Sequence, residues 1–281
     1  MVPHSRLALL GLCSLSWLSA IHGAAVQPSP TSNPGEEDLI DLQTAINGPA
    51  QVLRPRGGSS PPSVVYRGDN VNYSPDYYRK LGGIPPEFSG PFTNDSFSLT
   101  LHHWGDNVGP YRHNNYSSAY ASTSGKFGIA MAFSQWDSQK VKLNAFDGWV
   151  YEIQPTPNMI DVVASGVKIM FKRDEAEYAA MGKIAWQQVK RYIFYHPDKK
   201  WIENPDYNPE YDGCRAGGAQ PDLVGDPLRR VSCPAGKTLE RLAVEFMDRN
   251  GAVVGWNGTF PLDLKAPADF SSGICGGSAH V

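Results

Sequence analysis

The sequence predicts an α+β fold, in which strands and helices do not alternate as βαβ units. Three observations support this class. The apolar segments are short, several alternate between apolar and polar residues as half-buried strands do, and helical segments are few. A doubly wound α/β fold would instead place a long helix between consecutive buried strands, and this chain lacks that rhythm.

The individual elements follow from the residue pattern in chain order. Val64–Tyr66 predicts a strand that ends in a turn at Gly68-Asp69-Asn70, and Tyr77–Leu81 predicts a short helix. The segment Trp186–Tyr195 fits a strand or a short helix equally well. Further expected elements are a helix at Phe127–Trp136 and strands at Trp149–Ile153, Met159–Val163 and Val167–Phe171.

Near the C-terminus the pattern indicates a β-hairpin. Leu242–Met247 and Ala252–Trp256 are short apolar segments, and the Asn250-Gly251 pair between them is a favoured hairpin turn. The residues after Pro267 are rich in Gly and Ser. We therefore expect residues 236–281 to form a hairpin followed by a tail.

The N-terminus has the layout of a secretory signal peptide. His4 and Arg6 precede an apolar run, Leu7–Ala20, and small residues follow up to Gly23. The run is shorter than the roughly 20 residues that a membrane span needs. We expect residues 1–23 to be removed and the mature protein to be secreted, with no membrane span. The net charge of -3 gives no indication of a nucleic-acid-binding protein.

Composition divides the rest of the chain into four parts. Residues 24–61 are rich in Pro, Ser, Gly and Asn, which predicts a flexible pro-segment or linker. A compact domain at 62–200 follows, where we expect the functional site. A Gly/Pro-rich segment, 201–235, separates that domain from the C-terminal part, 236–281.

The cysteines fit an oxidising compartment. Cys13 leaves with the signal peptide, and the mature chain keeps Cys214, Cys233 and Cys275. Cys214 and Cys233 are the candidate pair nearest in sequence, and this pairing leaves Cys275 without a partner. Spacing alone does not fix the pairing.

Two glutamates two positions apart are the candidate catalytic groups. In an extended segment Glu175 and Glu177 would share one face and point into one cleft. Paired carboxylates suit chemistry at a glycosidic bond, because one stabilises an oxocarbenium-like sugar while the other handles the nucleophile. By itself, the pair reads more simply as part of a solvated acidic surface.

The surrounding landmarks resemble those of the ADP-ribosyltransferases of the cholera toxin and heat-labile enterotoxin type. They occur in the family's order across about half of the chain. They are Tyr66-Arg67-Gly68-Asp69, Ser122-Thr123-Ser124, Pro157-Asn158-Met159, and Glu175-Ala176-Glu177 followed by Gly182, Ile184 and Trp186. The ordered set favours the catalytic interpretation of the two glutamates.

The resemblance implies roles for the candidate NAD-binding residues. Arg67 is expected to contact the NAD pyrophosphate, for which a planar guanidinium is well suited. Ser122 is expected near the nicotinamide ribose. Thr123 and Ser124 would hold their strand in place. A pocket histidine is expected at His102 or at its neighbour His103, and the sequence leaves both open.

The resemblance also implies the reaction. Glu177 would be the catalytic glutamate that stabilises positive charge as nicotinamide departs from NAD, the co-substrate. Glu175 would position and deprotonate the acceptor. A Glu at this place goes with an arginine acceptor in the family, so we expect transfer to an arginine of a host protein inside host cells. No metal is implied. Two alternatives remain: a secreted effector without catalysis, and an NAD glycohydrolase.

The implied fold has two small, twisted sheets that form an NAD cleft. The segment between Cys214 and Cys233 carries Arg229-Arg230, a candidate processing site, and resembles the nicked, disulfide-linked loop of enterotoxin A chains. Those chains end in a long helix that threads a ring of B subunits. The predicted hairpin and tail depart from this, which puts a B-subunit partner in doubt, and we do not predict one.

Overall fold

The structure is a computed structural model that describes residues 61–86, 91–104, 117–134, 148–168, 175–194, 200–225, 236–273 and Cys275. All of these lie in residues 34–281, the larger of the two compact units into which the chain divides. The predicted signal peptide, nearly all of the predicted linker, and the Arg229-Arg230 pair lie outside the described residues.

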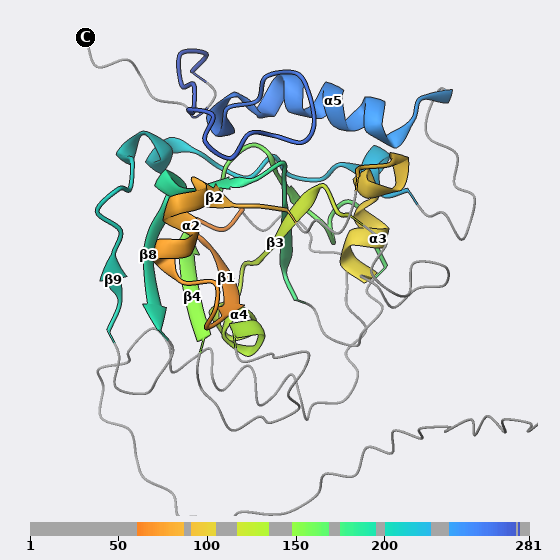
Figure 1. Cartoon of the computed structure of the whole chain (residues 1–281). Helices are drawn as coiled ribbons and strands as arrows, with labels where there is room; N and C mark the ends of the chain where they lie inside the picture. Colours follow the sequence, from red (N-terminus) through yellow and green to blue (C-terminus); the bar gives the residue numbers. More distant parts are fainter. Residues whose placement is uncertain are drawn as a thin grey trace, which may run out of the picture. The chain divides into compact units, whose positions relative to one another are not determined.

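Seven strands form one antiparallel sheet, in the order β5-β6-β3-β1-β4-β8-β9 (Figure 1). A second sheet pairs β2 with β7. The strands are β1 Val65–Asn70, β2 Gly83–Ile84, β3 Tyr120–Ser124, β4 Gly148–Ile153, β5 Met159–Asp161, β6 Glu177–Met181, β7 Ile184–Ala185, β8 Val189–Phe194 and β9 Ile202–Glu203. Neighbouring strands run antiparallel, which confirms the predicted α+β class.

The helices in the described part of the chain are short, except for one near the C-terminus. The α-helices are α2 Pro75–Leu81, α3 Leu99–Trp104, α4 Phe127–Ser134 and α5 Leu239–Asn250. The 3-10 helices are η1 Asn94–Phe97, η4 Trp186–Gln188, η5 Pro209–Gly213, η6 Pro221–Leu223 and η8 Ala252–Val254. Among the described residues, no helix has both the length and the apolar character needed to cross a bilayer.

Most of the predicted strands and helices are confirmed. The strand at Trp149–Ile153 is β4, the helix at Phe127–Trp136 is α4, and Met159–Val163 contains β5. Both alternatives for Trp186–Tyr195 are realised, because η4 precedes β8. The predicted strand Val167–Phe171 lies mostly outside the described residues.

The predicted turn at Gly68-Asp69-Asn70 is wrong, because β1 continues to Asn70. Gly68 serves a different purpose: a Cβ there would lie 1.6 Å from the Ala130 carbonyl oxygen of α4. The glycine therefore allows the helix to approach the strand closely, as Figure 1 shows for α4 and β1.

The predicted C-terminal hairpin is also wrong, because residues 239–250 form the helix α5. Thr238 caps its N-terminus by accepting a hydrogen bond from Arg241 N. The buried residues recur at helical spacing: Leu239, Ala243, Phe246 and Met247. Asn250-Gly251 thus marks the end of a helix rather than a hairpin turn, a use that the dipeptide alone does not reveal.

α5 belongs to the main core. Its buried face packs in one apolar cluster with Tyr120 of β3 and Met181 of β6. The segment after α5 returns over the same body, where Leu262 joins this cluster. The C-terminal part is therefore integral to the domain that carries the sheet.

The disulfide joins Cys214 to Cys275, and not to Cys233 as the sequence suggested. The physical reason is the path of the C-terminal segment. The buried ammonium of Lys183 donates to the carbonyls of Asp263, Leu264 and Ala266, and the ring of Phe270 packs edge-on against Tyr211. These contacts bring Cys275 back to the body, 61 residues after Cys214.

Candidate functional site

The centre of the site is the carboxylate of Glu177, the first residue of β6, which is only 6% exposed. α3 presents two consecutive histidines to it. His102 Nε2 lies 3.1 Å from Glu177 Oε1, and His103 Nδ1 lies 2.6 Å from Oε2. Each carboxylate oxygen thus has its own imidazole partner. The sequence left His102 and His103 open as the pocket histidine, and in the structure both contact Glu177.

Glu175 stands beside Glu177, but not for the reason expected from a simple strand. Ala176 between them has a φ of 48°, in the left-handed region that alanine rarely adopts. Gly125 N donates to the Ala176 carbonyl and Ser124 Oγ donates to the Glu175 carbonyl, and both bonds hold the turn. Convergence of the two glutamates is therefore produced by a fixed turn that leads into β6.

A second part of the site is built on β1 and β3. Arg67 donates from Nε and from one terminal nitrogen to Asp69, at 2.8 and 2.9 Å, and from the other terminal nitrogen to the Ser122 carbonyl at 3.0 Å. Tyr78 of α2 donates its hydroxyl to the same Asp69 carboxylate at 3.0 Å. Three bonds therefore fix the plane of the guanidinium against the backbone of β3.

The Ser122-Thr123-Ser124 strand connects the two parts. Ser122 Oγ lies 2.9 Å from His102 Nε2, the nitrogen that also contacts Glu177. Thr123 Oγ1 donates to the Tyr178 carbonyl of β6. In the register of β3 and β6, Ser124 stands opposite Glu177. Each of the three side chains thus ties β3 to α3, to β6 or to the glutamate turn.

The electrostatics favour a charged Glu177. Burial by itself would raise the pKa of this carboxyl, but the hydrogen bonds and positive charge of His102 and His103 hold it below its usual value. Burial likewise opposes a charged His103, yet its bond to Glu177 raises the pKa of the imidazole above its ordinary range. Both shifts favour the charged forms, an imidazolium at His103 beside a carboxylate at Glu177.

Three side chains of the site are close enough together to coordinate a metal ion. His103, Glu175 and Glu177 each offer one ligand atom, and these atoms lie within 4.8 Å of one another. The distance also shows that the carboxyl groups of Glu175 and Glu177 lie close to each other. The sequence-based expectation that the protein needs no metal remains a prediction.

The structure brings together all the predicted residues of the pocket. Arg67, His102, Ser122 and Glu177 are joined through β3, and Glu175 lies next to Glu177. Thr123 and Ser124 stand on the same strand.

Sequence reasoning missed three partners: Asp69, Tyr78 and Ser118, whose Oγ lies 2.7 Å from His102 Nδ1. Asp69 had a usable signal, since alternate residues of a strand face the same way and it stands two positions after Arg67. The other two come from separate elements, and no local pattern links them to the site.

The class of protein follows from a match to a family model, that of an ADP-ribosyltransferase toxin chain. The match spans residues 62–229, more than half of the chain. The protein therefore belongs to the family described as heat-labile enterotoxin alpha chain. This confirms the resemblance on which the sequence-based roles rest.

Solved structures of toxins are similar to the chain at low identity. A double mutant of heat-labile enterotoxin is 19% identical, with 66% of this chain and 89% of that chain covered and a TM-score of 0.46. A mutant of Escherichia coli heat-labile enterotoxin is 21% identical, with 61% and 98% covered and a TM-score of 0.43. Scabin toxin from Streptomyces scabies in complex with NADH is 20% identical, with 52% and 76% covered and a TM-score of 0.30. Comparison with curated protein sequences finds no match.

Proposed function

We propose that this protein is a secreted mono-ADP-ribosyltransferase that cleaves NAD, releases nicotinamide and transfers ADP-ribose to an arginine of a host protein. The observation that carries the proposal is the buried Glu177 carboxylate, bound by two histidines and accompanied by the Glu175 carboxyl group. The held guanidinium of Arg67 lies on the other side of Ser122. These groups suit displacement at a nicotinamide–ribose bond, because the carboxylate can stabilise positive charge on the ribose and the guanidinium can bind the pyrophosphate.

Arg67 is the residue that would hold the pyrophosphate of the co-substrate. Its bonds to Asp69 and to the Ser122 carbonyl orient the guanidinium before the dinucleotide arrives. A preoriented guanidinium loses less freedom on binding than a mobile lysine would. Asp69 also keeps the arginine charge partly compensated while the site is empty of substrate.

Glu177 would stabilise the positive charge that develops on the ribose as the bond from C1′ to the nicotinamide nitrogen breaks. The electron pair of this bond leaves with nicotinamide. A carboxylate that is already ionised and held by His102 and His103 needs no reorganisation at that moment. The surrounding burial strengthens its effect, because little water screens the charge.

Glu175 would accept the proton that the attacking arginine nitrogen loses as its bond to C1′ forms. It sits on the turn before β6, beside the reacting centre but outside the strand. A carboxylate there pairs naturally with an incoming guanidinium. This supports arginine as the acceptor, in agreement with the sequence-based expectation.

The test is NAD hydrolysis and transfer to agmatine, a soluble guanidine, by the purified protein. Glu177→Ala should lower both rates at least about 100-fold, as expected for the loss of a group that stabilises charge in the transition state. Glu175→Gln should lower transfer far more than hydrolysis. Glu210→Ala changes an exposed glutamate of η5 and serves as the matched control.

The outcomes separate the proposal from its alternatives. A wild-type protein that neither hydrolyses NAD nor transfers ADP-ribose would be a secreted effector without catalysis. Hydrolysis without transfer to agmatine or to proteins of a host-cell lysate would make it an NAD glycohydrolase. Equal losses of both activities in Glu175→Gln would remove the acceptor role of that residue.

Secretion and processing complete the proposal. The N-terminal layout of residues 1–23 and the Cys214–Cys275 disulfide support export through an oxidising compartment. Cleavage after Arg230 would fall inside the loop that this disulfide closes, so the two fragments would stay covalently linked. Mass spectrometry of the secreted protein with and without reductant tests this: a single intact species under both conditions contradicts it.

Because α5 shares the main core, we expect the fragments to remain associated even after reduction. Phe246 and Met247 share an apolar cluster with Tyr120 and Met181, and this packing does not depend on the disulfide. Size-exclusion chromatography of nicked, reduced protein without denaturant should therefore show one species.

A further inference from the structure

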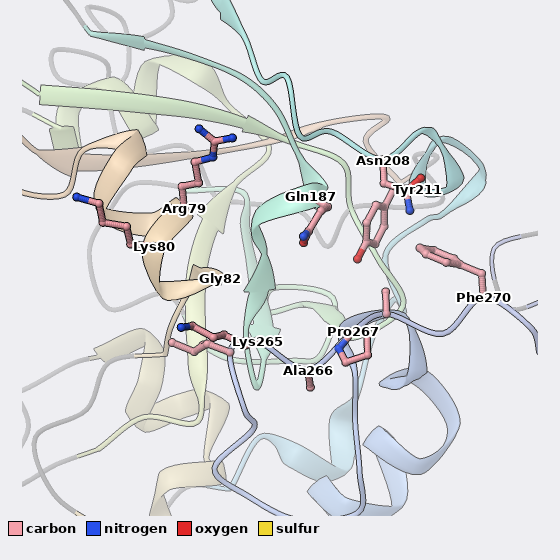
Figure 2. Close-up of a pocket in the computed structure, with 12 residues that line it drawn as sticks. Arg79, Lys80, Gly82, Gln187, Asn208, Tyr211, Lys265, Ala266, Pro267 and Phe270 are labelled. Atoms are coloured by element: carbon pink, nitrogen blue, oxygen red, sulfur yellow. The ribbon is translucent and has the colours of Figure 1, made fainter.

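A cavity of about 610 Å³ lies away from the glutamate site, between α2 and the C-terminal segment (Figure 2). Its walls are the end of α2, the region around Gln187 and Asn208, and residues 264–268 with Phe270. None of the residues assigned above to NAD chemistry lines it. The volume falls in the range of about 300–1,000 Å³ that is typical of ligand sites.

The cavity is positively charged on one side. Arg79, Lys80 and Lys265 line it, and no acidic residue is among its lining residues. Figure 2 shows these three cations on one side, with Gln187 between them and the aromatic residues opposite. Asp206 pairs with Arg79 at 2.7 Å and takes part of its charge. The exposed Lys80 and Lys265 therefore dominate the attraction for an anion.

The opposite side is apolar and aromatic. Phe270 and Pro267 form the accessible part of this side, and the buried Tyr211 supports Phe270 edge to face, with ring centroids 4.9 Å apart. The carboxamides of Gln187 and Asn208 border the same space (Figure 2). A ligand matched to these walls needs an anionic end, an apolar group, and polar atoms between them.

The wall formed by the C-terminal segment is firmly built. Lys183, completely buried, donates to three carbonyls of residues 263–266. Gly82 approaches so closely that a Cβ there would lie 2.7 Å from the Leu264 carbonyl oxygen. The Cys214–Cys275 disulfide fixes the segment beyond Phe270. The cavity is thus preformed, which lowers the entropy lost when a ligand binds.

We propose that this cavity binds an acidic peptide segment of a partner protein. Acidic side chains of the segment contact Lys80 and Lys265, an apolar side chain packs on Phe270 and Pro267, and the carboxamides of the wall pair with the peptide backbone. A bare phosphate or carboxylate would leave the aromatic side uncovered, and a purely apolar ligand would leave the lysines without a partner. The site is independent of the NAD chemistry proposed above.

Fluorescence anisotropy with a labelled Glu-Leu-Glu-Leu-Glu-Phe peptide tests the proposal. The test variant is Lys80→Glu/Lys265→Glu. The matched control, Lys237→Glu/Arg241→Glu, reverses two charges at α5 and leaves the cavity unchanged. Both doubles change the net charge equally. We expect the cavity double to bind at least about 10-fold more weakly than wild type, the control to bind within about 2-fold, and NAD hydrolysis to be unchanged in both.

A second probe with glutamine in place of each glutamate distinguishes acidic recognition from apolar contact. We expect this probe to bind at least about 10-fold more weakly to the wild-type protein. The proposal is overturned if no binding is detected up to about 1 mM peptide, if both doubles lose affinity equally, or if the glutamine probe binds as well as the acidic one.

Discussion

The Cys214–Cys275 disulfide gives the sharpest prediction for stability. The bond closes a loop with a sequence separation of 61 residues. On the chain-entropy relation, a loop of this length destabilises the unfolded state by about 4 kcal/mol. For a domain of this size, each kcal/mol corresponds to about 2–4 °C, so loss of the bond should lower Tm by about 8–16 °C.

The comparison is best made in a background that cannot form another disulfide. Cys275→Ala alone would leave Cys214 able to pair with Cys233. We therefore compare Cys233→Ser with Cys233→Ser/Cys275→Ala by thermal unfolding, monitored by circular dichroism without reductant. The single variant should unfold close to wild type and the double variant about 8–16 °C lower.

Two results would refute this reasoning. If Cys233→Ser alone caused the large loss, the functional pairing would be Cys214–Cys233. If the double variant had the same Tm as the single variant, the contacts of Lys183 and Phe270 would hold the segment without help from the disulfide. Reduced wild-type protein should match the double variant.

Three further predictions concern the site and its support. His103 contributes to the low pKa of Glu177, so the pKa of this carboxyl should rise in His103→Ala. The acid limb of the kcat/KM profile for NAD should then move to higher pH, and an unmoved limb would contradict this. Gly68→Ala should destabilise the protein by about 3 kcal/mol or more, because its Cβ would meet the Ala130 carbonyl; denaturant titration measures this, and a loss under about 1 kcal/mol would show that the helix moves easily. Lys183→Met should lower the free energy of unfolding by about 2–4 kcal/mol in the same titration, because three carbonyls lose their donor. The C-terminal segment should also become sensitive to protease, and unchanged proteolysis would argue against this role of Lys183.

The sequence predicted the site better than it predicted the C-terminal part. Arg67 and the Glu175/Glu177 pair were located because their order along the chain is that of the family, and this order is visible without a structure. The pairing of Cys214 depends on contacts between distant segments, whereas α5 has local signals of its own, the Thr238 cap and apolar residues at helical spacing. Tertiary packing of the C-terminal segment overrode the preference for the nearer cysteine, and the hairpin prediction gave the Asn250-Gly251 pair more weight than the helical pattern before it.

The route by which the two glutamates converge was likewise not predictable. A strand pattern predicts that residues two apart face the same way, and it contains no signal for a left-handed alanine. The bonds from Ser124 and Gly125 that hold Ala176 in this conformation come from β3 and the residue after it. The expectation was right about the outcome and wrong about the backbone that produces it.

The left-handed turn at Ala176 places the two glutamates in different backbone surroundings. Glu177 lies in the ladder between β3 and β6, and its buried side chain contacts His102 and His103. Glu175 lies outside that ladder, on a fixed turn that is held through the backbone carbonyls of Glu175 and Ala176. The side chain at position 175 can therefore vary without loss of the backbone bonds that hold the turn, whereas a change at position 177 removes the contacts with both histidines.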